Sequence, residues 1–431
     1  MFHAQRLFGP GSEAADILGH APFLDRARNE RARDRHDEAR SALGAYLVAR
    51  LVDRLLALDA ESPEAVEALR WQLESTRRFL SELPPGETEA AHLSGIVDAV
   101  SGEERYRIGV VRVTLNAYAY YLEHEGRLEE ALDMLALSGR TWAGELPGAE
   151  FVSLGLFAGR LNRLLARWDA ATAAYRAACD AALASGDHGA AFRARLGWAK
   201  VSMGQGNLPA ARAAIEAILT ETEGDKDLEE VQGLAYADLG ALMLRQGAQV
   251  DAVQAMYEAF LRTPDPVNRM RVLGDIGLGL KELRVFDAAR LALEIVAGSN
   301  IGYVVRTNAV IELMELEAMA HNRIGFERWR TEARDMMERM PPSMAIDYRS
   351  KAGEGLARFG QADRAAALWR EGLTLAESHG LNQWYFTLER QLENLQSAVP
   401  ADTTPAAPPG APNELATVTA GLRDFALAGR G

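Results

Sequence analysis

The sequence predicts an all-α fold, a right-handed α-solenoid of about seven antiparallel helix pairs with helical caps. Three observations lead to this prediction: the chain is rich in alanine, its apolar residues recur at helical spacing, and a two-helix pattern repeats about every 40 residues. Alanine and leucine lose little conformational freedom on entering a helix, whereas the β-branched residues that favour strands dominate no segment of this chain.

Composition and charge exclude several functional classes. The chain has 431 residues, with 61 acidic against 47 basic side chains and a net charge of −14. An overall negative field argues against binding to nucleic acid or to an anionic membrane surface. A single cysteine excludes an intramolecular disulfide and a cysteine-based metal site. Because no apolar run has the length of a signal peptide or a membrane span, we expect a cytoplasmic protein.

The first hundred residues are predicted to form an arm followed by helices. Residues 1–22 are rich in glycine and proline and are expected to form a flexible arm. Leucines at intervals of three and four predict a helix over 23–58. Ser62-Pro63 begins a second helix that runs to about residue 83, because serine caps a helix N-terminus well and proline suits the first turn. The segment 23–105 is interpreted either as a helical cap or as degenerate repeats.

Internal repetition begins after residue 106. Each copy has a turn residue and, five positions later, a small residue that lets two antiparallel helices cross closely. These small residues fall at 131, 171, 211, 252, 289, 325 and 365, and the gaps between them are 40, 40, 41, 37, 36 and 40. A second small residue precedes most turns by seven positions, and a bulky residue follows the first small one by four. Each pair therefore exposes an apolar face that only a neighbouring pair can cover.

The pattern resembles the tetratricopeptide repeat (TPR) family in its long-repeat variant. The family's sequence of leucine-glycine, turn glycine, alanine and aromatic residue is best matched by Leu239, Gly240, Gly247, Ala252 and Met256. The resemblance covers 106–397, and it departs from the usual 34-residue repeat because several copies are about six residues longer. It implies a superhelix whose first helices line a concave groove, which in this family holds a segment of a partner protein.

The C-terminal region divides into three parts. Apolar residues at helical spacing predict a closing helix over 381–396. Residues 398–412 contain five prolines and are expected to be a linker, because such a composition cannot build a core. Residues 413–431 form a tail in which 413–428 can make a short helix. Deletion of 398–431 is expected to leave the melting temperature nearly unchanged.

No active-site motif stands out, so we expect no enzyme, no cofactor and no metal. The phosphate-binding, dinucleotide-binding, nucleophile-elbow and zinc-protease motifs are all absent from the sequence. The Glu89-x-x-His92 spacing matches one half of a di-iron site, but such sites need two copies and further glutamates. Cys179 lies among alanines and is interpreted as a small packed thiol.

One constellation points to a binding surface. Counting back from each turn places polar and basic residues on the concave wall. The alternative interpretation is a set of ordinary surface arginines that this register happens to select. The expected groove residues are Asn116, Tyr120, Arg160, Arg163, Arg193, Lys200, Arg271 and Lys281. A concave surface lined with positive charge attracts anions. The partner is therefore expected to be a protein or peptide that is acidic or has a free C-terminus, and neither nucleic acid nor membrane.

The favoured function is a non-enzymatic interaction module that holds a partner segment in this groove. The alternative is a regulatory sensor, in which a peptide or small ligand changes the curvature of the superhelix and so gates a partner. The sequence identifies no partner or pathway.

Overall fold

The computed structural model describes residues 7, 19–59, 61–84, 88–141, 146–299, 303–337, 340, 342–378, 381–396 and 412–428. The chain divides into two compact units, unit 1 (Met1–Ala214) and unit 2 (Ile215–Gly431). The described residues form helices, turns and bends and no strand, which confirms the prediction of an all-α fold. None of the described helices combines the length and the apolar character needed to cross a membrane.

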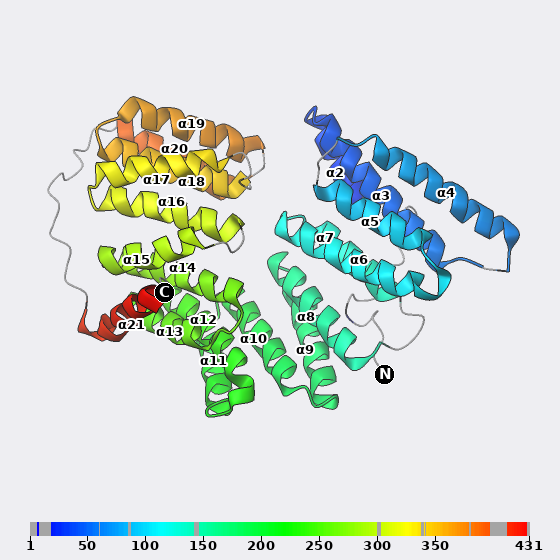
Figure 1. Cartoon of the computed structure of the whole chain (residues 1–431), viewed down its shortest axis with the longest axis horizontal. Helices are drawn as coiled ribbons and strands as arrows, with labels where there is room; N and C mark the ends of the chain where they lie inside the picture. The colour runs from blue at the N-terminus through cyan, green and yellow to red at the C-terminus, as the bar shows by residue number, and fades with distance from the viewer. Residues whose placement is uncertain are drawn as a thin grey trace. The chain divides into compact units, whose positions relative to one another are not determined.

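Unit 1 contains the N-terminal helices and the first repeat pairs (Figure 1). Its helices are α2 (Ala21–Ala32), α3 (His36–Leu56), α4 (Pro63–Ser81), α5 (Thr88–Ser101), α6 (Glu104–His124), α7 (Leu128–Arg140), α8 (Gly148–Leu164), α9 (Trp168–Ala184) and α10 (His188–Gly204). The boundary between the units falls inside α11 (Leu208–Glu221).

Unit 2 continues the pairs and adds the closing helix and the tail. Its elements are η1 (Lys226–Leu228), α12 (Glu229–Arg245), α13 (Gln249–Arg262), α14 (Pro266–Glu282), α15 (Phe286–Gly298), α16 (Tyr303–Met319), α17 (Arg323–Asp335), α18 (Pro342–Arg358), α19 (Ala362–Ser378), α20 (Asn382–Gln396), η3 (Asn413–Leu415) and α21 (Ala416–Ala428). From α6 to α19 the chain therefore forms seven successive pairs, a TPR-like helical repeat.

Every repeat pair turns at a residue with a left-handed backbone. The seven turn residues, with φ between 55° and 81°, are Gly126, Ala166, Gly206, Gly247, Arg284, His321 and Gly360. Glycine adopts this conformation at no steric cost, whereas other residues tolerate it only when the surrounding structure holds them there. Three of these turns have alanine, arginine or histidine in place of glycine, and there the two packed helices of the pair hold the backbone in this conformation.

The small residues bring the two helices of each pair together. Six alanines that follow the turns by five positions are fully buried: Ala131, Ala171, Ala211, Ala252, Ala289 and Ala365. Glycines on the first helix of a pair leave space for bulky side chains on its second helix. A Cβ atom on Gly159 would lie 2.7 Å from Tyr175 Cε1, and one on Gly353 would lie 2.3 Å from Trp369 Nε1. These close approaches require glycine.

The sixth copy differs from the predicted register. Its turn is His321, so the position five residues later is Phe326 rather than Gly325. Phe326 is fully buried, and the neighbouring first helix makes room for it with Gly355, where a Cβ atom would lie 2.2 Å from Phe326 Cε2. In this copy the bulky residue lies on α17 and the small residue that faces it, Gly355, lies on α18. The predicted position of the small residue, Gly325, was wrong by one residue.

The described N-terminal region contains two more helices than the sequence predicted, because the first predicted helix is divided and α5 was not predicted. The expected helix over 23–58 is interrupted at Asp34, whose φ of 57° separates α2 from α3. Ala39 follows Asp34 by five residues and is 6% exposed, the same spacing as in the later pairs. The predicted second helix is confirmed: Ser62 Oγ accepts a hydrogen bond from the backbone N–H of Ala65 at 3.2 Å.

The described part of the predicted arm is packed rather than loose. Leu7 is 3% exposed and lies against Gly155, and His20 is 5% exposed between two carboxylates. His20 Nδ1 lies 2.6 Å from Asp133 and His20 Nε2 lies 3.0 Å from Asp53. Burial lowers the pKa of His20, but the two carboxylates outweigh it and raise that pKa to about 9. His20 is therefore charged at neutral pH and anchors the start of α2.

The tail is also packed, and this changes the effect that we expect from its deletion. Leu415, Val418 and Leu422 are 0%, 2% and 0% exposed, and they belong to the apolar core of unit 2. Their spacing of three and four residues is that of one helix face. Deleting the tail would uncover this face, so from the structure we expect the deletion to lower the melting temperature rather than leave it nearly unchanged. The predicted linker, up to residue 411, lies outside the described residues.

The close crossings predict a strong penalty for bulk. We expect Ala171→Leu to lower the free energy of unfolding of the chain by about 1–3 kcal/mol, because Ala171 is 0% exposed and an added isobutyl group overpacks the crossing. The adjacent Ala170 is exposed, so Ala170→Leu is the matched control and should change stability by less than about 0.5 kcal/mol. Chemical denaturation followed by circular dichroism measures both. Equal stabilities for the two variants would contradict the assigned packing.

Candidate functional site

The predicted groove residues of unit 1 lie on its first helices. Three successive first helices carry them, α6, α8 and α10, and α8 packs against α10. Tyr120, Arg160 and Lys200 each precede a turn by six residues, so they occupy the same position in successive repeats. We call the surface of these three helices the unit 1 face; it comprises Asn116, Tyr120, Arg160, Arg163, Arg193 and Lys200.

An aromatic and charged stack joins α6 to α8. The rings of Tyr120 and Phe157 are stacked with their centroids 4.2 Å apart, and the Arg160 guanidinium lies 4.7 Å from the centroid of Phe157. Arg160 also donates from Nη2 to Glu123 Oε2 at 2.8 Å. Tyr120 remains 53% exposed. The stack presents a large aromatic ring to solvent and holds a guanidinium beside it, which is the kind of surface that anchors a partner.

Three polar atoms of the unit 1 face are buried without a hydrogen-bond partner among the described residues. One is Arg160 Nε, which still lies 2.7 Å from Glu123 Oε1 in an ion pair. The other two are Arg163 Nε, a donor, and Asn116 Oδ1, an acceptor. A buried polar atom without a partner costs free energy, so such atoms are rare in folded proteins. Arg163 lies three residues after Arg160 on the same side of α8. A donor and an acceptor are thus both left unsatisfied on the same surface.

The third helix of the unit 1 face contributes two cations. Arg193 and Lys200 are both partly buried on α10. They are seven residues apart, which is about two helical turns, so both point from one side of α10. Together with Arg160 and Arg163 they give this face four basic groups. Arg160 forms an ion pair with Glu123.

Unit 2 departs from the predicted basic wall. Arg271 is exposed on α14 and hydrogen-bonds to Asn268. Lys281, however, is 1% exposed and its ammonium group is enclosed by carboxylates. Lys281 Nζ donates to Glu312 Oε2 at 2.6 Å and also to Glu315. The expectation that Lys281 faces a partner is therefore wrong, because its charge is already neutralised inside the protein.

A charged cluster on the first helices of unit 2 surrounds Lys281. Lys351 bonds to Glu312 and lies 3.4 Å from Glu315 and 3.2 Å from Asp347. Burial would raise the pKa of Glu312, but the ammonium groups of Lys351 and Lys281 outweigh it and hold that pKa below its usual range. Burial raises the pKa of Asp347 to about 6, against the effect of Lys351. This cluster, Lys281, Glu312, Glu315, Asp347 and Lys351, joins α14, α16 and α18.

The sequence contained a signal for this cluster. Glu315 precedes the turn residue His321 by six positions, the same interval that separates Tyr120, Arg160 and Lys200 from their turns. Sequence reasoning missed it because the sixth copy is weak and its turn is not a glycine. The first helices of unit 2 therefore carry more carboxylates than the predicted wall allowed, and four of the six predicted basic groove residues lie in unit 1.

No family model matches the chain. No curated protein matches it either.

Three solved structures have similar arrangements at low sequence identity. The apo form of the quorum sensor NprR from B. thuringiensis is 11% identical over 82% of this chain and 97% of that chain, with a TM-score of 0.48. The Rap conjugation gene regulator of the plasmid pLS20, in complex with the Phr* peptide, is 13% identical over 84% and 98%, with a TM-score of 0.45. NprR in complex with its cognate peptide NprX is 11% identical over 85% and 99%, with a TM-score of 0.44. None of these scores reaches 0.5.

Proposed function

We propose that the protein is a non-enzymatic interaction module and that the unit 1 face binds an acidic segment or a free C-terminal carboxylate of a partner protein. The observation that carries this proposal is the pair of unsatisfied buried atoms, Arg163 Nε and Asn116 Oδ1. A peptide offers both complements: carboxylate or carbonyl oxygens for the arginine, and backbone N–H groups for the asparagine. Charge-assisted contacts to arginine are stronger than neutral hydrogen bonds.

The neighbouring side chains suit the same ligand. The exposed ring of Tyr120 supplies apolar contact next to the Arg160 guanidinium. Arg193 and Lys200 extend the positive charge along α10. In a chain of net charge −14, this concentration of basic groups steers an anionic segment toward unit 1.

The test is a charge reversal on α8. We expect the double variant Arg160→Glu/Arg163→Glu to bind a fluorescent Glu-rich dodecapeptide at least tenfold more weakly than the native chain, a loss of about 1.4 kcal/mol. The physical reason is that the change removes two cations and adds repulsion beside Glu123. Fluorescence anisotropy at low salt measures the affinity, and the same peptide with an amidated C-terminus reports the share of the terminal carboxylate. Raising the salt should weaken binding to the native chain.

The matched control is Arg70→Glu/Arg78→Glu. It makes the same change in net charge on exposed positions of α4, away from the unit 1 face. It should bind the peptide nearly as well as the native chain. Native affinity in the α8 variant, with native helicity by circular dichroism, would refute the proposal.

A regulatory sensor is the second candidate function. The division of the chain into two compact units, with its boundary inside α11, favours it, because a chain of two units has a place at which its shape can change. Solution scattering with and without the Glu-rich peptide distinguishes the candidates. A sensor changes its radius of gyration when the peptide binds, and a scaffold keeps it.

A further inference from the structure

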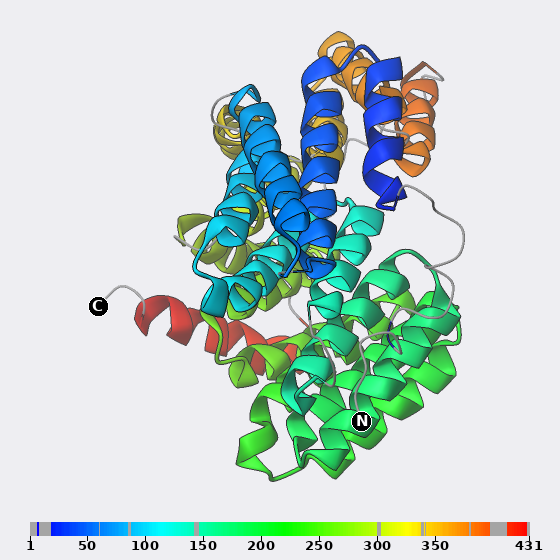
Figure 2. The ribbon, with the colours of Figure 1, turned by 90° about the vertical axis from the view of Figure 1, so that its right-hand side faces the viewer.

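The C-terminal helix α21 sits on second helices of unit 2. It contacts α13 and α15, and η3 contacts α13. Figures 1 and 2 show α21, drawn in red, beside the green helices of this unit. We propose that this surface of α13 and α15 is a binding site for an amphipathic helix of another protein, and that the chain's own tail competes with that helix. This proposal is independent of the function assigned to the unit 1 face.

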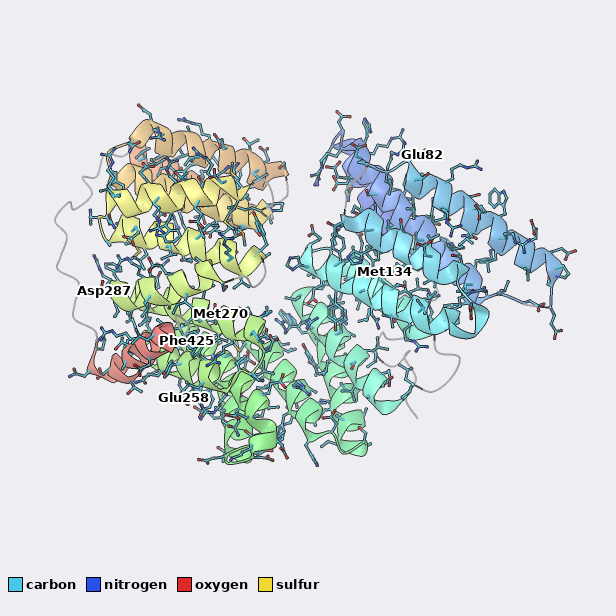
Figure 3. All side chains as sticks on the ribbon, in the orientation of Figure 1. Glu82, Met134, Glu258, Met270, Asp287 and Phe425 are labelled. Atoms are coloured by element: carbon cyan, nitrogen blue, oxygen red, sulfur yellow. The ribbon has the colours of Figure 1, made fainter. Side chains whose placement is uncertain are left out.

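The apolar side of α21 defines what the site accepts. Leu415, Val418 and Leu422 are buried, and Phe425 completes the same side of the helix. Phe425 meets Phe260 of α13 edge-on, with ring centroids 5.0 Å apart. Phe425 of α21 is labelled in Figure 3. The spacing of 3, 4 and 3 residues between these four side chains is the helix-in-groove pattern of recognition.

A glycine sets how closely the docked helix can approach. A Cβ atom on Gly421 would lie 1.7 Å from the Tyr257 hydroxyl oxygen and 2.7 Å from Tyr257 Cζ. Only a helix with glycine at this position can lie so near α13 without moving Tyr257. The site therefore selects helices that have glycine directly before the third apolar residue, as Gly421 precedes Leu422. This selectivity distinguishes it from an unspecific apolar patch.

Polar contacts at the two ends fix the direction of the helix. Gln254 Nε2 donates to the backbone carbonyl oxygen of Glu414 at 2.7 Å. At the other end, the Arg269 guanidinium lies 4.5 Å from the centroid of Phe260 and 5.2 Å from that of Phe425. A helix bound in reverse would lose both contacts. These contacts make the site directional.

The tail is separable from the repeats that hold it. Helix α13 packs on α12 and α14, and α15 packs on α14 and α16, so both helices have their repeat partners without α21. The five prolines of 398–412 give the connecting segment little means of packing. When α21 leaves, Tyr257 and Phe260 lose their cover, and an exposed apolar surface of this kind marks an interaction site. A foreign helix of the same pattern fits the vacated surface.

Tethering explains why the tail regulates this site. A covalently linked segment competes at an effective concentration that can reach the order of millimolar. An incoming helix must therefore overcome the tail before it binds. Cutting the connection between α20 and α21 removes this high effective concentration and leaves the residues of the surface unchanged. Cleavage therefore tests the competition directly.

The experiment uses the full-length chain with a specific protease site inserted into 398–411. The probe is a fluorescein-labelled peptide of residues 412–428, followed by anisotropy before and after cleavage and removal of the released tail by gel filtration. We expect the cut chain to bind the peptide, and the uncut chain to bind it at least tenfold more weakly because of the tether. Equal binding to the cut and uncut chains would overturn the proposal, as would no binding to the cut chain.

Two peptide variants test whether the site reads the pattern. Gly421→Leu in the peptide should abolish measurable binding, because the new side chain meets Tyr257. Ala420→Leu is the matched control: Ala420 is exposed on α21, so the same new side chain points into solvent and binding should persist. Equal loss with both variants would show that the site does not read Gly421.

A designed peptide tests whether any amphipathic helix with this pattern binds. It keeps the glycine and the four apolar residues of the tail at their spacing and has Ala, Glu and Lys at all other positions. It should bind the cut chain, and a scrambled version should not. The assignment to a foreign helix would be overturned by equal binding of the scrambled peptide. It would equally be overturned if the uncut chain forms a concentration-dependent dimer that Gly421→Leu in the chain abolishes, since the occupant would then be the tail of a second copy.

Discussion

Replacing Glu89 by glutamine is expected to lower the free energy of unfolding by about 3–5 kcal/mol, the usual cost of breaking a buried ion pair from one side. Glu89 is 5% exposed and accepts four hydrogen bonds. Arg26 donates to it at 2.9 Å and 3.2 Å, Arg127 at 2.7 Å, and the Tyr118 hydroxyl at 2.6 Å. The variant leaves two buried guanidinium groups without their shared anion, and α2, α5 and α6 lose their common contact.

The pH dependence of this effect has a definite sign. Burial would raise the pKa of Glu89, but Arg26 and Arg127 outweigh it and lower that pKa from 4.5 to about 2. A carboxyl with a depressed pKa stabilises the fold above its unfolded pKa and loses this contribution as pH falls through the folded value. The stability difference between the native chain and Glu89→Gln should therefore be full above pH 4.5 and shrink toward pH 2.

The control for this prediction is Glu129→Gln. Glu129 forms an ion pair with Arg167 at 2.7 Å, but both side chains are about half exposed, so the loss should be about 0–1 kcal/mol. Denaturant titrations at pH 7 and pH 3 measure both variants. A Glu89→Gln variant as stable as Glu129→Gln at pH 7 would show that the buried cluster does not hold unit 1 together.

The second large effect is expected at Lys281 in unit 2. Lys281→Met removes the ammonium group that bonds to Glu312 and Glu315 and should destabilise the chain by about 3–5 kcal/mol. Burial would lower the pKa of Lys281, but Glu312 and Glu315 raise it, so the lysine is charged in the native chain. Methionine fills a similar volume, and the loss therefore reports two buried carboxylates left with Lys351 as their shared cation, rather than a cavity.

A second substitution, at Glu315, distinguishes a loss caused by buried carboxylates from one caused by a cavity. Lys281→Met combined with Glu315→Gln removes one of the stranded charges, so the double variant should recover part of the lost stability and show a coupling between the two positions. Lys226 is exposed, and Lys226→Met is the control for loss of a lysine, with an expected change within about 0.5 kcal/mol. If adding Glu315→Gln lowered the stability of Lys281→Met further, the account of an excess of buried carboxylates over ammonium groups would fail.

The candidate site was predictable only in part. Counting back from the turns placed Tyr120, Arg160 and Lys200 at one position of successive first helices. It did not reveal that Arg160 is paired with Glu123 or that Arg163 Nε is unsatisfied, because both facts depend on side-chain distances between helices. The same count put Lys281 on the wall and missed the carboxylates that enclose it.

The sequence by itself determined the helix pairs. Turn residues and the small residues that follow them lie within five positions of each other, and helix geometry converts that local spacing into a close crossing, as Ala171 and Ala252 illustrate. The tertiary structure alone decided which distant residues meet. His20 contacts Asp133 across 113 positions of sequence, and Gln254 contacts Glu414 across 160. Such pairs leave no periodic trace, because they depend on how complete helices pack and on which apolar faces remain to be covered.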